Sequence, residues 1–202
     1  MSQENYTHVT FVVDRSGSMR DIAADMTGGI KTLIDEQFAE PGQITITLTQ
    51  FDDTVETCQR LATTPFTYEL RPRGSTALLD AVGREIVKTG EDLAALPEDK
   101  RPARVLFVVV TDGMENASSE FRIAQVRDLI AQQTGQYGWQ FQFLGAEEAA
   151  WQGGDLGMKQ ARFAKTRAGS VGSLARINSS LKQFRADESK FADFYIDEDI
   201  ED

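Results

Sequence analysis

Strand patterns alternate along the chain with helical patterns. Residues 6–13 alternate between apolar and polar side chains and then become fully apolar, and residues 104–111 hold the strongest apolar run. Both patterns are typical of strands that are buried on both faces of a sheet. Shorter alternating or apolar stretches predict further strands at residues 44–51, 139–144 and 161–164.

Residues 55–61 predict a strand of a different kind. Only Asp52-Asp53-Thr54 separate them from the strand before. So short a link allows a hairpin, whereas a parallel crossover needs a dozen or more residues. We therefore expect residues 55–61 to form an antiparallel strand at the edge of the sheet.

Apolar residues at intervals of three and four predict four longer helices. Their apolar positions run over residues 22–38, 78–93, 123–130 and 171–184. Residues 146–151 predict a short helical piece, which the glycines at 153, 154 and 157 are expected to end. Alternating strands and helices indicate an α/β fold, specifically a doubly wound, mostly parallel sheet with one antiparallel edge strand and helices on both faces.

The 202 residues are enough for one domain, which we place at residues 1–186. Residues 187–202 differ, because they carry eight acidic residues and one lysine, and they predict an acidic C-terminal tail. An acid from this tail could reach a neighbouring copy of the chain. A homo-oligomer formed through the tail is therefore one hypothesis about its role.

Composition narrows the expected partners and compartment. The formal net charge is −11, so we expect neither nucleic acid nor an anionic membrane surface as a partner. The first residues lack the pattern of a signal peptide, and no apolar run approaches a membrane span, so a cytoplasmic location is expected. Cys58 is the single cysteine, which excludes an intrachain disulfide.

Side chains that offer oxygen atoms gather where predicted strands end or predicted helices begin. They are Asp14, Ser16 and Ser18 after the first strand, Ser75 and Thr76 before the second helix, and Asp112 after the most apolar strand. In a doubly wound sheet, ligands bind outside the carboxyl ends of the strands. If the strands predicted at residues 6–13 and 104–111 are neighbours, Asp14 and Asp112 face one crevice.

Two carboxylates and three hydroxyls, with either Ser75 or Thr76 as the third, would supply most of a six-oxygen shell for a metal ion. Hard oxygen donors suit Mg²⁺, Mn²⁺ or Ca²⁺ better than zinc. We expect Mg²⁺, because it readily keeps water molecules in a partly filled shell, with Mn²⁺ and Ca²⁺ as alternatives. The same side chains have a simpler interpretation, since Ser16 or Ser18, Ser75 or Thr76, and Asp112 could each cap a following helix or turn.

At these residues the chain resembles a von Willebrand factor A (vWA) domain with a metal-ion-dependent adhesion site (MIDAS). The family's pattern is Asp-x-Ser-x-Ser, then a distant threonine, then Thr-Asp-Gly. The matching residues here are Asp14, Ser16, Ser18, Thr76 and Asp112. The resemblance covers roughly residues 6–185, favours Thr76 over Ser75, and points to the stand-alone intracellular type found in bacteria and phages.

The resemblance implies binding rather than catalysis, so we expect the chain not to be an enzyme. In the family, the serines and the threonine contact the metal directly or through water, and the aspartates often act through water. A carboxylate from a partner protein completes the shell. Intracellular members are often linked to AAA+ ATPase assemblies, so the resemblance also implies an adaptor role.

Other functions fit the sequence less well. A phosphotransferase or hydrolase with Asp14 as nucleophile would need a second aspartate two residues on, where this chain has Ser16. A nucleotide-binding domain would need a glycine-rich or Walker-type loop, which does not follow the first strand. A serine hydrolase would usually need a well-placed histidine, and His8 is the single one. A vWA fold that binds no metal is a further alternative.

Four arginines flank the predicted site in the sequence. They are Arg15, Arg20, Arg71 and Arg73. Because the whole chain is acidic, we interpret them as a local basic rim that attracts an acidic partner segment to the metal.

Overall fold

Six strands form one sheet in the order β3-β2-β1-β4-β5-β6. The two most apolar strands, β1 and β4, lie side by side in its middle and pair in parallel, which explains why their sequences are apolar on both faces. The strands are β1 (Gln3–Asp14), β2 (Gln43–Phe51), β3 (Val55–Ala62), β4 (Pro102–Thr111), β5 (Gln140–Ala146) and β6 (Lys159–Phe163).

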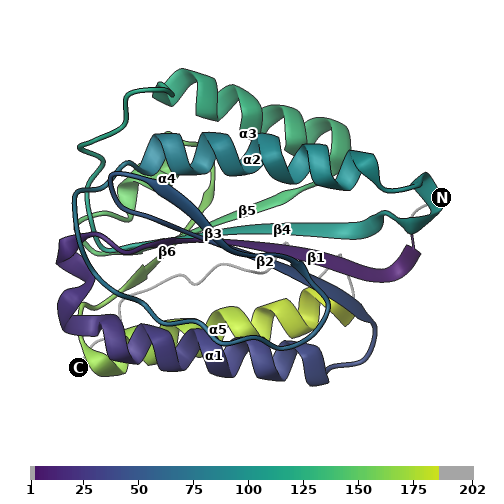
Figure 1. Ribbon diagram of the computed structural model, residues 1–202, viewed down its shortest axis with the longest axis horizontal. Coiled ribbons are helices and arrows are strands. Elements are labelled where there is room, and N and C mark those ends of the chain that lie inside the picture. Colours follow the sequence, from purple (N-terminus) through teal and green to yellow (C-terminus); the bar gives the residue numbers. More distant parts are fainter. Residues whose placement is uncertain (1–2, 187–202) are drawn as a thin grey trace.

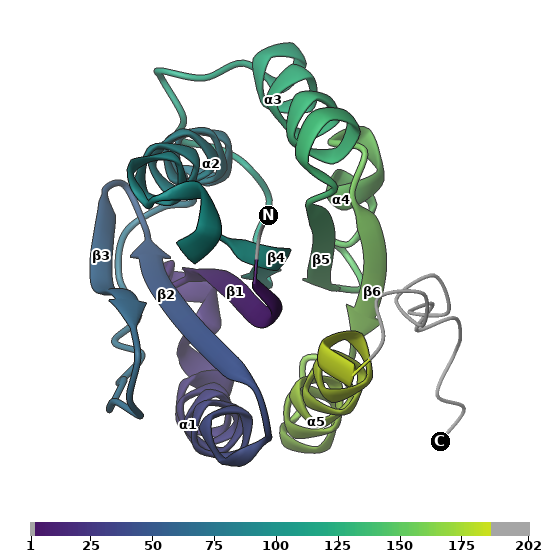
Figure 2. The same cartoon turned by 90° about the vertical axis from the view of Figure 1, so that its right-hand side faces the viewer.

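The computed structural model describes residues 3–186 and is shown in two views (Figure 1 and Figure 2). The predicted acidic tail, residues 187–202, lies outside the described residues, so the domain boundary at residue 186 stays a prediction. Within the described part of the chain, no helix has the length and apolar character needed to cross a membrane.

The predicted fold class is confirmed. β3 pairs with β2 in the antiparallel direction and forms one edge of the sheet, whereas all other neighbouring strands are parallel. Helices cover both faces: α1 and α5 lie on one face, and α2 and α3 lie on the other (Figure 1, Figure 2). The helices are α1 (Ala23–Ala39), α2 (Leu78–Ala95), α3 (Ile123–Tyr137), α4 (Trp151–Asp155) and α5 (Arg167–Ala186), with short 3₁₀ turns at Gly17–Ile22 and Glu98–Lys100.

The short helix after β5 differs from the prediction. It spans Trp151–Asp155 and therefore contains Gly153 and Gly154, which were expected to end it. The reason is packing, because a Cβ on Gly153 would lie 2.5 Å from the Cβ of Phe143 on β5. Gly157 does end the helical segment as expected, with a φ of +80° that favours glycine.

The sheet separates two apolar cores. Along β4, Val108 and Val110 face α1 and α5, while Phe107 and Val109 face α2 and α3. This alternation follows from the two-residue period of a strand, and both sets are fully buried. The central strands are thereby fixed in position, and so are the loops that leave their carboxyl ends.

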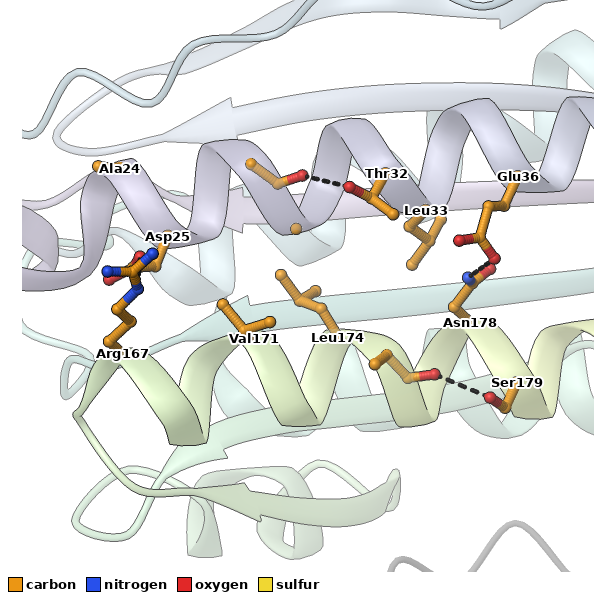
Figure 3. Close-up of a pocket in the computed structure, with 13 residues that line it drawn as sticks. Ala24, Asp25, Thr32, Leu33, Glu36, Arg167, Val171, Leu174, Asn178 and Ser179 are labelled. Carbon is orange, nitrogen blue, oxygen red and sulfur yellow. Dashed lines mark hydrogen bonds and ion pairs between the residues drawn. The ribbon is translucent and has the colours of Figure 1, made fainter.

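A groove of about 470 Å³ runs between α1 and α5 (Figure 3). Arg167 and Asp25 face each other at one end, with Nε and Oδ1 3.4 Å apart. At the other end, Asn178 Nδ2 donates to Glu36 Oε2 over 2.8 Å. Leu174 comes so close to Gly29 that an added Cβ there would lie 2.5 Å from its Cδ1. None of the five predicted metal ligands lines this groove.

A buried polar network surrounds His8 near the start of β1. The ring Nδ1 lies 2.8 Å from Thr45 Oγ1, and Nε2 lies 3.0 Å from Thr10 Oγ1. The network continues to α2, where Thr89 donates to Glu85 over 3.0 Å. Burial, with the nearby Arg60 charge, lowers the pKa of His8 to about 3, so the ring is neutral in the folded protein near pH 7.

Candidate functional site

The first loop starts with Asp14, the last residue of β1. Its side chain is buried, and both carboxylate oxygens are engaged. The backbone N–H of Ser16 donates to Oδ1 over 2.6 Å, and the hydroxyl of Thr111 donates to Oδ2 over 2.5 Å. These bonds orient the carboxylate at the junction of β1 and β4.

The hydroxyls of Ser16 and Ser18 lie next to each other on the same loop. Their oxygens are 2.9 Å apart, and Ser18 Oγ donates to Asp112 Oδ1 over 2.6 Å. Ser16 is the residue before the 3₁₀ turn, but its side chain makes no capping bond there. The capping interpretation is therefore wrong for Ser16, and Ser18 directs its hydroxyl to Asp112.

Thr76 lies on the second loop, directly before α2. Thr76 is buried and Ser75 is exposed. The loop is fastened to Asn116, whose Oδ1 accepts from Thr76 N–H over 2.9 Å and whose own N–H donates to Thr76 O over 3.0 Å. Neither hydroxyl caps α2, because Glu115 accepts the N–H of Leu79 instead.

Gly113 marks the point where the predicted ligands meet. A Cβ placed on this glycine would lie 2.9 Å from Thr76 Oγ1 and 3.3 Å from both Asp14 Oδ2 and Ser18 Oγ. The structure therefore brings all five predicted residues together, since Ser16 touches Ser18 and Ser18 touches Asp112. Asp112 does not cap α3, which begins only at Ile123.

Asp112 carries an acceptor atom with unused capacity. Its side chain is buried, and within the described residues Oδ2 accepts no hydrogen bond of good geometry. The ammonium of Lys165, on the loop between β6 and α5, lies 2.5 Å from this oxygen as a charge partner. A buried carboxylate oxygen with no hydrogen bond is what a cation site needs.

The pKa of Asp14 is raised to about 6. Burial is the main cause, because it disfavours the charged form, and the nearby charge of Asp112 acts in the same direction. Hydrogen bonds from Thr111 and Ser16 oppose the rise only in part. Two carboxylates thus share a poorly solvated place, which favours a cation between them.

Residues outside the predicted set support the third loop, Asp112–Glu115. Gln152 on α4 donates to Gly113 O over 3.0 Å and accepts from Glu115 N–H over 2.8 Å. No sequence pattern pointed to Gln152, because the short helix was expected to end before it. Lys165 follows the strand predicted at residues 161–164, and a basic residue at a strand end is its one signal in the sequence.

Asp80 fastens the segment that follows. Its carboxylate accepts the N–H groups of Ser119, Glu120 and Phe121 over 2.8–2.9 Å. Burial alone would raise its pKa, but these three bonds outweigh it and lower the pKa of Asp80. The loop after Asp112 is therefore tied to α2, the helix that follows Thr76.

The interpretation of the arginines as a basic rim is wrong for Arg15. Arg15 is buried, with Nε 2.9 Å from Asp52 Oδ2 and Nη1 2.6 Å from Glu56 Oε2. Arg73 also pairs with Asp52, at 2.6 Å. Although burial alone would raise the pKa of Asp52, these charges and the bonds from Thr54 lower it to about 2. The guanidinium of Arg15 therefore anchors β2 and β3 to the first loop.

The donor set fits a hard divalent cation. Among the described residues, no group of three or more His, Cys, Asp or Glu side chains could hold a metal ion by itself. A metal at this place would depend on the hydroxyls as well as on Asp14 and Asp112. Oxygen-only donors, an acceptor without a hydrogen bond and the approach of three ligand oxygens to one point beside Gly113 together suit Mg²⁺, Mn²⁺ or Ca²⁺.

A scan of protein-family models and a search of curated proteins found no match. Solved structures do match. A mutant of the PilB minor pilin from Streptococcus sanguinis has a TM-score of 0.63 and 14% identity, over 92% of this chain and 62% of that chain. A von Willebrand factor type A structure from Catenulispora acidiphila has a TM-score of 0.58 and 14% identity, over 86% and 42%. The pilus adhesin SpaC from Lactobacillus rhamnosus GG has a TM-score of 0.63 and 11% identity, over 87% and 30%.

These likenesses define the fold. The chain has the α/β architecture of a von Willebrand factor A domain, with helices on both faces of a mostly parallel sheet. At identities of 11–14%, the comparisons show the fold alone. The chain spans less than two thirds of the length of each of these matched structures.

Proposed function

We propose that the chain is a divalent-metal-dependent protein-binding module of the MIDAS type. Asp14, Ser16, Ser18, Thr76 and Asp112 would hold the ion, and Mg²⁺ is the expected one. When bound, the ion supplies a fixed positive charge with an open position for an oxygen ligand. A carboxylate from a partner protein would take that position.

The observation that carries this proposal is the meeting of three loops around Gly113. Oxygens of Asp14, Ser18 and Thr76 lie within 3.3 Å of one point in space. Asp112 adjoins them through Ser18, and its Oδ2 accepts no hydrogen bond of good geometry within the described residues. A helix-capping role would have drawn the side chains of Ser16, Ser18, Thr76 and Asp112 to nearby backbone N–H groups instead. The exposed position of Ser18 leaves one side of the cluster open to a partner.

The choice of an acidic partner follows from charge. Two aspartates and a divalent ion leave the site without the net negative charge that would repel a carboxylate. Arg15 and Arg73 are already paired with Asp52, so the ion itself is the main source of attraction. As an adaptor, such a module would dock onto a larger assembly, for example an AAA+ ATPase that presents an acidic side chain.

The alternative of a phosphotransferase with Asp14 as nucleophile has less support. A nucleophile needs a free oxygen that can reach a substrate, but Asp14 is buried and both its oxygens already accept hydrogen bonds. A screen with p-nitrophenyl phosphate and each metal tests it. Turnover that disappears in Asp14→Asn would replace the binding proposal by the enzymatic one.

The adjacent hydroxyl residues Thr76 and Ser75 provide the main test of the metal site. Calorimetric titration with Mg²⁺, Mn²⁺ and Ca²⁺ should give binding in the wild type, a loss of at least about tenfold in Thr76→Ala, and little change in Ser75→Ala. Thr76→Ser should restore most of the affinity, because it keeps the hydroxyl. Absence of binding in the wild type, or equal effects of the two alanine variants, would contradict the proposed site.

A second experiment addresses carboxylate capture. In Mn²⁺-loaded protein, water bound to the ion enhances the relaxation of bulk water protons. Sodium acetate should lower this enhancement, because a carboxylate displaces bound water, while acetamide at the same concentration should not. Equal effects of acetate and acetamide would remove the acidic-ligand part of the proposal and leave the metal site standing.

A further inference from the structure

Lys165 places a positive charge inside the cluster of predicted ligands. Its Nζ lies 2.5 Å from Asp112 Oδ2, the oxygen that accepts no hydrogen bond of good geometry within the described residues. The Asp112 side chain is fully buried, whereas 35% of the Lys165 side chain is exposed. The lysine therefore enters the site from the solvent side, and it can leave without unfolding any element.

The loop that carries Lys165 is held firmly at its backbone. Thr166 N–H donates to Ala164 O over 2.7 Å, and Gly169 N–H donates to Thr166 Oγ1 over 3.1 Å at the start of α5. Any side chain at position 169 would overlap the carbonyl oxygen of Ala164. Since the backbone is fixed, the freedom of Lys165 lies in its four-carbon stem.

We propose that Lys165 acts as a tethered cation that competes with the divalent ion for Asp112. In the metal-free protein the ammonium balances the charge of a buried carboxylate, which otherwise has no counter-charge at that oxygen. A divalent ion that binds Asp112 would displace it, because two cations at one carboxylate oxygen repel each other strongly in a poorly solvated place. The inference rests on the proposed metal site and adds that its affinity is lowered by the chain's own side chain.

This arrangement has a consequence for the partner. When displaced, the ammonium stays within the length of its own side chain from the open side of the site. It is then available to an incoming carboxylate, so that metal loading and recognition of acid would be coupled through one lysine. Arg15 and Arg73 do not offer this, because both are paired with Asp52.

The test compares Lys165→Met with Lys100→Met. Methionine keeps most of the stem but removes the charge, and Lys100 is an exposed lysine before β4, at the opposite end of the sheet. Calorimetric titration with MgCl₂ and MnCl₂ should give affinity at least about fivefold tighter in Lys165→Met than in the wild type. Lys100→Met should stay within about twofold, which controls for the change in net charge.

Thermal unfolding gives an independent readout. Without metal, Lys165→Met should have a Tm about 2–6 °C below the wild type, because Asp112 loses its charge partner. Saturating Mg²⁺ should reduce that difference. Lys165→Arg should bind the metal nearly as the wild type does, because it keeps the charge, and Lys165→Gln replaces Lys165→Met if the latter fails to fold.

The outcomes separate this inference from the proposed function. If the wild type binds metal and Lys165→Met binds it equally or more weakly, competition is overturned while the metal site stands. If only the lysine variant binds metal, competition is supported and the wild type is a site blocked by its own side chain. If neither binds metal, both ideas are overturned.

Discussion

β1 carries two buried polar clusters that differ in one respect. Around His8, near the beginning of the strand, donors and acceptors alternate: the ring bonds two threonines, and the chain of contacts ends on Glu85, which also accepts from Thr49 and Arg60. Around Asp14, at the other end of the strand, two buried carboxylates lie in one cluster, and the Lys165 ammonium is the charge partner of Asp112. Asp112 keeps a buried oxygen without a hydrogen bond, whereas every buried side-chain atom of His8 and Glu85 has a partner.

This difference distinguishes a polar cluster that serves the fold from one that serves a ligand. A network whose members are all satisfied stabilises a single arrangement of strands and helices. Two buried carboxylates in one cluster need positive charge, which Lys165 supplies at Asp112 and a divalent cation could supply to both. Substitutions in the cluster around His8 should therefore change protein stability only. Substitutions in the cluster around Asp14 should change metal binding as well.

The largest expected effect is acid destabilisation through His8. The pKa of this ring is about 3 in the folded protein against about 6.5 when unfolded, so the unfolded state binds more protons between these values. The stability contributed by the neutral ring is present above pH 6.5 and is lost as the pH falls toward 3. The loss should amount to about 3–5 kcal/mol.

Urea unfolding of the wild type and His8→Gln from pH 7.5 to pH 3.5 measures this loss. His8 is the single histidine, so no other imidazole contributes to the difference between the two proteins. The variant will be less stable at pH 7, but its stability should fall less steeply below pH 6.5. Parallel pH profiles would show that the ring is not buried in its neutral form.

Asp14 should make stability depend on pH in the opposite direction, with a smaller effect. Its pKa is raised from 3.8 to about 6, so the folded state binds more protons than the unfolded state between these values. The stability contributed by the protonated group is therefore lost as the pH rises through about 6. Above that pH, Asp14→Asn should stabilise the metal-free protein by about 1–3 kcal/mol, because the amide keeps the shape without the charge.

The measurement is urea unfolding at pH 7.5 in the presence of a chelator, followed by the same experiment with Mg²⁺. The exposed Asp128 on α3 supplies the control, since Asp128→Asn removes an equal charge. Mg²⁺ should stabilise the wild type and Asp128→Asn but not Asp14→Asn. A stabilising effect of Mg²⁺ on Asp14→Asn would contradict the role assigned to this carboxylate.

Much of this arrangement could be predicted from the sequence. Periodicity located the strands because β1 and β4 are buried on both faces, and the position of Asp14 and Asp112 at strand ends follows from that topology. The positions that escaped prediction depend on contacts between distant loops. Lys165 contacts Asp112 from two strands away, and its position after a strand does not predict which carboxylate it meets.

Arg15 was misinterpreted for a related reason. Its neighbours in sequence suggest a solvated loop, but its guanidinium turns inward to Asp52 and Glu56 on the β2–β3 hairpin. The prediction that Gly153 and Gly154 end the short helix is also wrong. A glycine in sequence suggests a break, whereas Gly153 permits close packing on Phe143 inside a helix.

The smallest expected effect concerns Gly113, which lies in contact with three predicted ligands. In Gly113→Ala the new methyl would lie 2.9 Å from Thr76 Oγ1, so the hydroxyl must move by a few tenths of an ångström. We expect metal affinity to fall about three- to tenfold and the metal-free protein to lose about 1 kcal/mol. Gly135→Ala on α3 is the control, because its Cβ would meet nothing within 4 Å and helix propensity alone should make it slightly stabilising. If Gly113→Ala destabilises the protein but leaves metal affinity unchanged, the close contacts at Gly113 serve packing alone. The cluster around Asp14 would then serve the fold, as the cluster around His8 does.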